Sequence, residues 1–308
     1  MTWRHISSDP LTTSNIARPV SHLALGTVQF GLAYGISNQI GQVSRLEAKD
    51  MLQLALSKGI DTLDTAIAYG DSESCLGAAG THGFKLITKL PELPDDTEDI
   101  GKWVHQQVMA SLSRLDVSSV YGLLLHRSEQ LLGPHRIALY QALQTLKEIG
   151  QVQKVGISIY SPSELSALSP EYHFDLVQAP FNLIDRRLHS SGWMQRLKDD
   201  GTEIHTRSSF LQGLLLMSQV DMPAKFIPWS GLWNRWHRWL EDHHVSAVQA
   251  CLAYPLAFPE IDRIVVGADS QAQLAQIISA ASHQPPTELP DLECNDQDLI
   301  NPSNWGNL

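Results

Sequence analysis

The sequence predicts an α/β protein built as a single (β/α)8 TIM barrel, with its active site at the C-terminal rim of the strands. Eight short apolar runs recur along the 308 residues, and a helix-like segment or a gap of helical length follows each of them. Several runs are almost wholly apolar, as parallel strands buried on both faces are. No GxGxxG or GxxxxGK motif favours the main alternative, a doubly wound nucleotide-binding sheet. The expected strands are residues 22–26, 60–64, 85–89, 121–126, 154–158, 174–178, 202–206 and 262–267.

The segments between the strands carry readable helix boundaries. Residues 44–47 and 161–164 both have serine followed three positions later by glutamate, which is the capping-box pattern of a helix N-terminus. Gly59 and Gly150 stand where glycine commonly ends a helix. The predicted helix over residues 44–58 would cover the sheet with one apolar side. That side is formed by Leu46, Met51, Leu52 and Ala55.

The chain divides into a barrel and two flanking segments. Residues 1–20 are predicted to be an N-terminal extension and residues 21–282 the barrel. Residues 283–308 are polar and rich in proline and asparagine, which predicts an irregular C-terminal tail.

Residues 211–240 are longer than an ordinary connection from strand to helix, and they carry four tryptophans. One interpretation is an amphipathic helix that packs through its aromatic side chains, which we favour for Trp236 and Trp239. The other is a lid over the mouth of the barrel, which stays open for Trp229 and Trp233.

Composition excludes several classes of protein. A net charge of −11 with scattered basic residues is not typical of a binder of nucleic acid or anionic membranes. No apolar run approaches the ~20 residues of a membrane span. Three scattered cysteines and a polar N-terminus predict a protein of the reducing cytoplasm. The histidines at 237, 243 and 244 give only a weak metal signal, so no metal site is expected.

Four titratable side chains follow three neighbouring strands. Asp64 ends the second predicted strand, Tyr69 lies in the loop after it, Lys89 ends the third and His126 ends the fourth. Parallel barrel strands end at one rim, so these groups should meet there. Taken singly, Asp64 could cap a helix, Lys89 could be a solvated loop lysine, His126 could be a satisfied rim histidine, and Tyr69 could serve for packing alone. Their shared placement favours an active site.

Such a set suits the reduction of a carbonyl group. A phenol has a pKa near ~10, and a neighbouring ammonium lowers that value towards the range of a useful acid. The carboxylate keeps the ammonium charged, and the imidazole can orient the substrate oxygen. Hydride for the carbonyl carbon requires a carrier, which points to a nicotinamide.

The order of these motifs resembles the aldo-keto reductase family. The resemblance rests on LDTAIAYGDSE, LITKL and YGLLLHR, and it extends from about residue 22 to about residue 280. The GTVQFG and SSFLQGLLL forms resemble a bacterial branch of that family. The resemblance to the family implies a (β/α)8 barrel that reduces a small-molecule carbonyl with NAD(P)H. Tyr69 would be the proton donor, Lys89 and Asp64 the pair that lowers its pKa, and His126 the carbonyl-orienting group.

The resemblance also implies where the cofactor binds. Ser158 and Gln178 match residues that bond the nicotinamide carboxamide. Gly26 and Thr27 match the turn beneath it, beside Asp64.

Further positions match the remainder of the dinucleotide. The loop around the pyrophosphate corresponds to Ser208, Leu211 and Gly213. The adenosine half corresponds to Gly267, Ala268, Asp269, Gln273 and Gln276. A helix beginning near Ser270 would offer backbone N–H groups to a phosphate.

Several positions depart from the family pattern. Ile159 replaces an asparagine that contacts the nicotinamide. Gly267 and Gln273 stand where many members have cations for the 2′-phosphate, and Ile277 replaces an adenine-binding asparagine. The expectation of NADP, with NAD possible, therefore comes from the family alone.

Arg207 replaces the aromatic residue that usually stacks on the nicotinamide. A guanidinium plane can also stack on a ring, and its charge would disfavour the oxidised, positively charged nicotinamide. The alternative is that Arg207 contacts a phosphate or an acid.

Two functions fit these observations. The first is an NAD(P)H-dependent reductase of aldehydes or ketones. The second is a cofactor-binding redox-sensing or regulatory subunit with little turnover. Phe30 and Tyr34 are expected to form an aromatic wall for the substrate, while the oligomeric state is not predicted.

Overall fold

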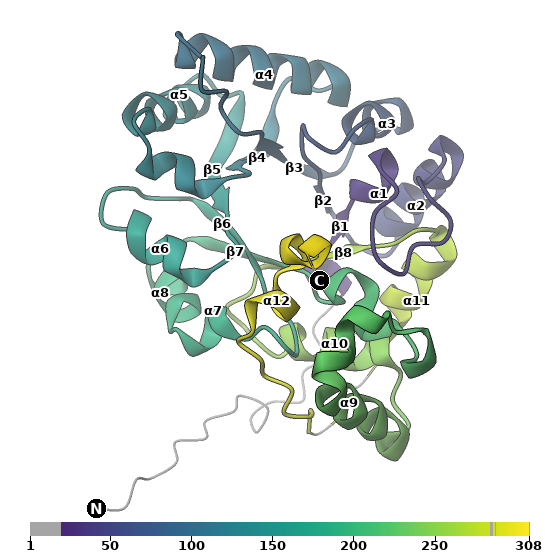
Figure 1. The fold of residues 1–308 in the computed structure, drawn as a ribbon. Coiled ribbons are helices and arrows are strands. Elements are labelled where there is room, and N and C mark those ends of the chain that lie inside the picture. Colours follow the sequence, from purple (N-terminus) through teal and green to yellow (C-terminus); the bar gives the residue numbers. More distant parts are fainter. Residues whose placement is uncertain (1–19, 284–285, 287, 308) are drawn as a thin grey trace, which may run out of the picture.

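The computed structural model describes residues 20–283, 286 and 288–307. Eight parallel strands pair in sequence order, and β1 also pairs with β8, so the sheet closes into a barrel (Figure 1). The predicted (β/α)8 fold is confirmed, and each predicted strand end lies within two residues of the observed end. The strands are β1 Leu23–Gly26, β2 Thr62–Asp64, β3 Lys85–Leu90, β4 Val120–Leu125, β5 Val152–Ser158, β6 Leu176–Pro180, β7 Glu203–Arg207 and β8 Arg263–Gly267.

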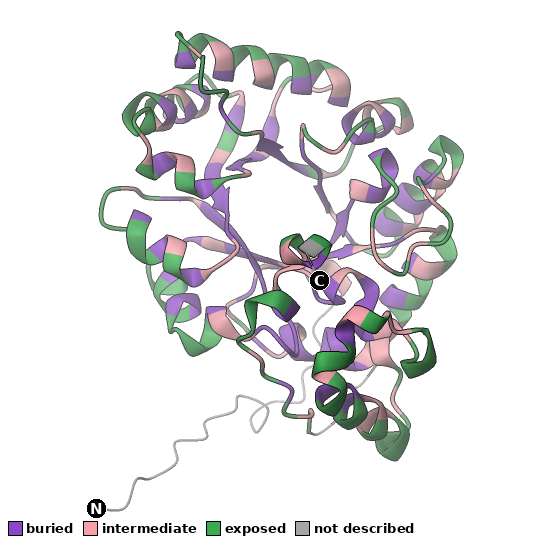
Figure 2. Cartoon of the chain, in the orientation of Figure 1, coloured by how far each residue is buried: buried purple, intermediate pink, exposed green. Residues whose placement is uncertain are grey.

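The barrel strands are buried on both faces, which is why they are apolar in sequence. Figure 2 shows the strands as a largely buried ring, with exposed residues gathered on the outer helices. Inside the barrel, Ile87, Leu124 and Leu176 form a small buried cluster apart from the main core. Side chains two residues apart on a strand share a face. Lys89, His126 and Gln178 therefore stand one layer above this cluster, which forms an apolar floor beneath the rim.

Helices separate the strands and pack around them (Figure 1). Ser161 forms the predicted capping box with Glu164. The Ser44 side chain accepts the backbone N–H of Glu47, but the Glu47 carboxylate accepts the N–H of Gln271 at 2.6 Å, so that box is incomplete. The helices of the barrel wall are α1 Val28–Gly31, α2 Arg45–Ser57, α3 Ser72–Ala79, α4 Ile100–Leu115, α5 Arg136–Glu148, α6 Pro162–Leu168, α7 Arg187–Ser190, α8 Trp193–Asp199, α10 Ala247–Leu256 and α11 Gln271–Ser282.

The buried side of α2 differs from the prediction at one position. Met51, Leu52 and Ala55 face the core with Ala48, whereas Leu46 is 72% exposed. Leu46 is the second residue of α2, and at this first turn its side chain projects outside the contact between the helix and the barrel.

The tryptophans of residues 211–240 pack away from the mouth of the barrel rather than forming a lid over it. This segment consists of 3-10 turns (Leu211–Leu216, Gln219–Asp221 and Ala224–Trp229) and helix α9 (Ser230–His243). Trp233 and Trp236 are buried and donate their indole N–H groups to the carbonyls of Phe226 and Leu215. None of the four tryptophans borders the cavity described below.

The C-terminal segment is more ordered than its composition predicted. It contains α12 (Gln297–Ile300) and a 3-10 turn (Pro302–Asn307), and it passes over the rim of the barrel (Figure 1). Leu292, Leu299 and Trp305 are buried, because a few apolar residues are spaced through the polar sequence. Apart from residue 20, the predicted N-terminal extension lies outside the described residues.

Candidate active site

The structure brings the four predicted titratable residues together at the rim. Lys89 donates to Oδ2 of Asp64 at 2.7 Å and to the backbone carbonyl of Thr65 at 2.9 Å. The Lys89 side chain is only 1% exposed. The Tyr69 ring lies over the pair, with its centroid 5.1 Å from Lys89 Nζ. His126 meets the Tyr69 ring edge-on, with centroids 5.7 Å apart and planes at 79°.

Burial and charge act against each other at Lys89. Burial favours the neutral amine, but the charge of Asp64 and, to a smaller extent, the phenol of Tyr69 raise the pKa of Lys89 above its ordinary 10.5. An ammonium ion is therefore held beneath the phenol at neutral pH.

His126 is neutral at the pH of the cell. Burial, followed by the charge of Lys89, lowers the pKa of His126 from 6.5 to about 4. A neutral imidazole has one N–H donor and one acceptor, so it can donate to an oxygen without bringing a positive charge.

This pKa shift predicts an acid-sensitive contribution to stability. The pKa of His126 is lower in the folded protein than in the unfolded chain. The contribution of the neutral His126 side chain to the free energy of unfolding is therefore complete above pH 6.5 and is lost as the pH falls towards 4. Between pH 7.5 and pH 4.5, wild type should lose about 1–2 kcal/mol more unfolding free energy than His126→Gln. Urea denaturation at both pH values measures this difference. The exposed His105 supplies the control, and an equal loss in His105→Gln and His126→Gln would contradict the assignment.

Close backbone packing and a buried ion pair position the Tyr69 loop. A Cβ added at Gly31 would lie 1.8 Å from the Tyr69 carbonyl oxygen, so only glycine allows this approach. Behind the loop, Glu73 in α3 is buried and accepts two bonds from Arg114, at 2.9 and 2.7 Å. Thr88 and Ser111 also donate to Glu73. The only sequence signals for these supports are the last glycine of GTVQFG and the last acid of LDTAIAYGDSE.

Gln178 completes the hydrogen bonding of the Asp64 carboxylate. Its Nε2 donates to Oδ1 of Asp64 at 2.6 Å, so both carboxylate oxygens have a donor. The Gln178 Oε1 is buried and has no hydrogen-bond partner among the described residues. Ser158 is paired with Gln178 in neighbouring strands. The sequence placed both residues at the rim but gave no sign of the Gln178–Asp64 bond.

A cavity of about 670 Å³ runs from these groups to the N-terminus of α11. It includes Tyr34, which was expected there, but not Phe30, which is wholly buried in the core because α1 turns it inward. Lys89 lies beneath the cavity wall and Leu211 is buried behind it. All other predicted site residues border the cavity: Gly26, Thr27, Asp64, Tyr69, His126, Ser158, Gln178, Arg207, Ser208, Gly213, Gly267, Ala268, Asp269, Gln273 and Gln276.

The α11 end of the cavity is acidic. Asp269 accepts from Asn38 Nδ2 at 3.2 Å. Burial raises the pKa of Asp269, and bonds from Gln273 and Gln29 oppose that shift. The expected free N–H groups at this helix N-terminus are partly used, because the N–H of Gln271 bonds to Glu47 and that of Gln273 to the Ser270 hydroxyl.

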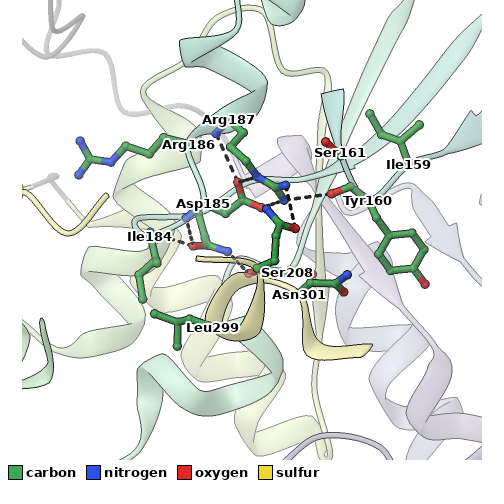
Figure 3. Close-up of polar contacts among 12 residues, drawn as sticks. Ile159, Tyr160, Ser161, Ile184, Asp185, Arg186, Arg187, Ser208, Leu299 and Asn301 are labelled. Atoms are coloured by element: carbon green, nitrogen blue, oxygen red, sulfur yellow. Dashed lines mark hydrogen bonds and ion pairs between the residues drawn. The ribbon is translucent and has the colours of Figure 1, made fainter. Parts of the chain in front are cut away.

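A buried polar platform supports the rim between β5 and β7, and the sequence analysis missed it. Figure 3 shows Arg187 between the Asp185 carboxylate and the Tyr160 carbonyl. Its Nη2 donates to Oδ2 of Asp185 at 2.8 Å and to the Tyr160 carbonyl at 3.0 Å. Asn182 donates to the Ser208 carbonyl at 3.0 Å. These residues follow the apolar run of β6, where the run PFNLIDRR is the only available signal.

The fold and this rim define a single-domain (β/α)8 enzyme with a buried lysine–carboxylate pair beneath a tyrosine. The comparisons place the chain in a family. Residues 22–289 match the model of the aldo/keto reductase family. The chain belongs to the aldo/keto reductase family and is an oxidoreductase.

Three similar proteins illustrate the match, and two of them cover most of the chain. The uncharacterized oxidoreductase YqkF of Bacillus subtilis is 24% identical over 289 residues, covering 87% of this chain and 90% of YqkF. A 6-dehydroglucose reductase of Novosphingobium aromaticivorans is 29% identical over 140 residues, covering 40% of this chain and 45% of that protein. The holo form of an aldo-keto reductase from Bacillus halodurans matches with a TM-score of 0.68 and 20% identity, covering 86% and 88% of the two chains. That structural likeness shows the fold.

Neither a bilayer-spanning helix nor a metal-binding cluster is present in the described residues. No helix there combines the length and apolar character that crossing a bilayer requires. No group of three or more histidine, cysteine or acidic side chains in that part of the chain could hold a metal ion.

Proposed function

We propose that this protein reduces an aldehyde or ketone to an alcohol, with hydride from a reduced nicotinamide and a proton from Tyr69. The observation that carries the proposal is the arrangement of the rim. A charged Lys89, held by Asp64, lies beneath the phenol, and a neutral His126 lies at its edge. All except Lys89 border one cavity, which leaves room for a substrate above them.

The residues present fit a dinucleotide. The unpartnered Oε1 of Gln178 can accept from a carboxamide N–H₂ group, and the Ser158 hydroxyl lies on the adjacent strand. Close packing at Gly213, where an added Cβ would lie 2.0 Å from Ser37 Oγ, shapes the middle of the cavity. Gln276 lies at the far end, so one continuous space can take an elongated ligand.

The roles of the residues follow from charge balance. A reduced nicotinamide, when bound, would supply a hydride, which is one proton with two electrons, to the carbonyl carbon. The C=O double bond becomes a C–O single bond, and Tyr69 gives its phenolic proton to the oxygen. The tyrosinate that remains is stabilised by the Lys89 ammonium, which uses two of its three donors on Asp64 and Thr65. The neutral His126 donates to the carbonyl oxygen and sets its direction.

The proposal is tested by binding and turnover in one preparation. Fluorescence titration with NADH and NADPH measures binding, and absorbance at 340 nm measures oxidation of the reduced cofactor by a panel of aldehydes and ketones. Binding with carbonyl-dependent oxidation supports the proposal. Tight binding without turnover across the panel would favour the regulatory alternative, and absence of binding would reject both.

We further propose that the cofactor is NADH rather than NADPH. Asp269 is the charged residue that borders the cavity near α11, and Glu47 occupies the first N–H group of that helix. No lysine or arginine in the described part of the chain borders that end. A carboxylate repels a 2′-phosphate but accepts hydrogen bonds from ribose hydroxyls.

Neutralising these carboxylates should shift the cofactor preference. We expect wild type to bind NADH at least about tenfold more tightly than NADPH, because two like charges a few ångströms apart cost more than ~1.4 kcal/mol. The double variant Glu47→Gln/Asp269→Asn should reduce that ratio by about tenfold. Asp116→Asn, at the C-terminal end of α4, is the matched control for loss of an acid. If the ratio of the NADPH Kd to the NADH Kd changes equally in the double variant and in Asp116→Asn, the role given to Glu47 and Asp269 is wrong.

A further inference from the structure

Arg207 is held firmly in the cavity wall. Its guanidinium carbon lies 4.8 Å from the centroid of the Tyr160 ring. Its Nη2 donates to the Ile159 carbonyl at 3.0 Å, and its Nη1 donates to the Ser208 hydroxyl at 3.3 Å. A guanidinium has five N–H donors, so most of them remain for a ligand.

The topology places this charge at the catalytic end of the cavity. Arg207 ends β7, and its side chain crosses β6 to reach residues 159 and 160, just beyond β5. The next strand, β4, leads to His126. Burial and Lys89 have the larger effects on the pKa of His126, but Arg207 also lowers it, which agrees with this position. The acidic α11 end follows β8, on the other side of β7.

The charge of Arg207 is not balanced within the described residues. The neighbouring rim arginines are paired, Arg187 with Asp185 at 2.8 Å and Arg186 with Asp291 at 3.8 Å. No ion pair joins Arg207 to a carboxylate of the described chain. Asp64 borders the same end, but Lys89 neutralises it. The catalytic half of the cavity therefore carries one uncompensated positive charge.

We propose that Arg207 binds an anionic group of the carbonyl substrate, a carboxylate or a phosphate, and so selects aldehydes or ketones that carry one. This inference rests on the proposed function. A guanidinium fork matches the geometry of both anions, and an arginine already held by stacking loses little side-chain freedom on binding. Tyr160 thus acts as a positioning residue that holds the guanidinium plane.

Matched pairs of aldehydes test the inference. We would compare succinic semialdehyde with butanal, 4-carboxybenzaldehyde with 4-methylbenzaldehyde, and glyceraldehyde 3-phosphate with glyceraldehyde. Wild type should prefer the anionic member of at least one pair by tenfold or more in kcat/KM. Arg207→Gln should lower kcat/KM for that member by roughly 10- to 100-fold, which is the usual value of a charge-assisted hydrogen bond. The uncharged member should lose less, so the preference for the anionic member within the pair should fall.

Arg127 provides a control for loss of positive charge. Its guanidinium also lies over the Tyr160 ring, at 5.6 Å, but the residue is exposed and does not border the cavity. Arg127→Gln should keep the discrimination within each pair, while Arg207→Lys, which keeps the charge without the fork, should retain part of it.

The outcomes that contradict this inference can be distinguished from those that contradict the proposed function. Wild-type turnover that is equal within all three pairs overturns the inference and leaves the proposed function standing. No turnover with any member overturns both. If Arg207→Gln weakens NADH binding without altering discrimination, the bound anion belongs to the cofactor. If it changes only the ratio of NADH to NAD⁺ affinity, the guanidinium stacks on the nicotinamide. Either result overturns the inference.

Discussion

Tyr69→Phe is expected to lower kcat for carbonyl reduction by at least about 10³-fold, which is in the middle of the range that general acid catalysis contributes. The substitution removes one hydroxyl group and leaves the ring that packs edge-on against His126. Without the phenolic proton, the oxygen that accepts negative charge has no acid beside it. Stopped-flow absorbance at 340 nm under saturating cofactor measures the step directly.

Cofactor binding and folding should survive this change. The Kd for the dinucleotide should stay within about twofold, because the contacts proposed for the dinucleotide involve other residues. Tyr140→Phe is the matched control, since it removes a phenol whose hydroxyl bonds to the His173 carbonyl at 2.9 Å outside the barrel. Retention of more than a tenth of wild-type kcat in Tyr69→Phe would falsify the proton-donor assignment.

Lys89→Met is expected to lower the free energy of unfolding by about 3 kcal/mol as well as abolish measurable turnover. The substitution leaves the Asp64 carboxylate buried with Gln178 as its remaining side-chain donor. The loss lies at the low end of the range for buried ion pairs because Asp64 borders the cavity. Urea denaturation at pH 7.5 measures the difference.

The double variant Asp64→Asn/Lys89→Met separates stability from catalysis. It removes both charges, so most of the lost stability should return while activity stays absent. Because the pKa of Lys89 is raised in the folded protein, the contribution of the Lys89 charge to the unfolding free energy is complete below pH 10.5 and is lost as the pH rises through the folded value. Comparable instability of the single and double variants would show that Lys89 stabilises by packing rather than by charge.

Local sequence patterns were sufficient to predict the strands of the barrel and the placement of the four titratable residues at its rim. Buried parallel strands leave continuous apolar runs, so the strand ends could be predicted closely, and polar residues that follow those runs must meet at the rim. The Gln178–Asp64 bond and the Arg187–Tyr160 bond join residues 114 and 27 positions apart, so no local pattern marks them.

The differences between the predicted and the observed environments of several side chains have a common cause. The C-terminal segment buries Leu299 and Trp305 although its composition is polar, and Trp233 fills a packing site rather than the cavity mouth. Leu46 is apolar but faces solvent. In each case the environment of the side chain depends on whether another part of the fold packs against it. Composition and local spacing do not contain that information.

The apolar floor formed by Ile87, Leu124 and Leu176 has a consequence for the catalytic cycle. In the proposed mechanism each turnover consumes the proton of the Tyr69 phenol, and these three hydrocarbon side chains cannot carry a replacement. The proton has to return through polar groups instead: either from solvent that enters the cavity bordered by Tyr69, or by way of His205, which is buried in the barrel and bonded to Glu203 at 2.7 Å.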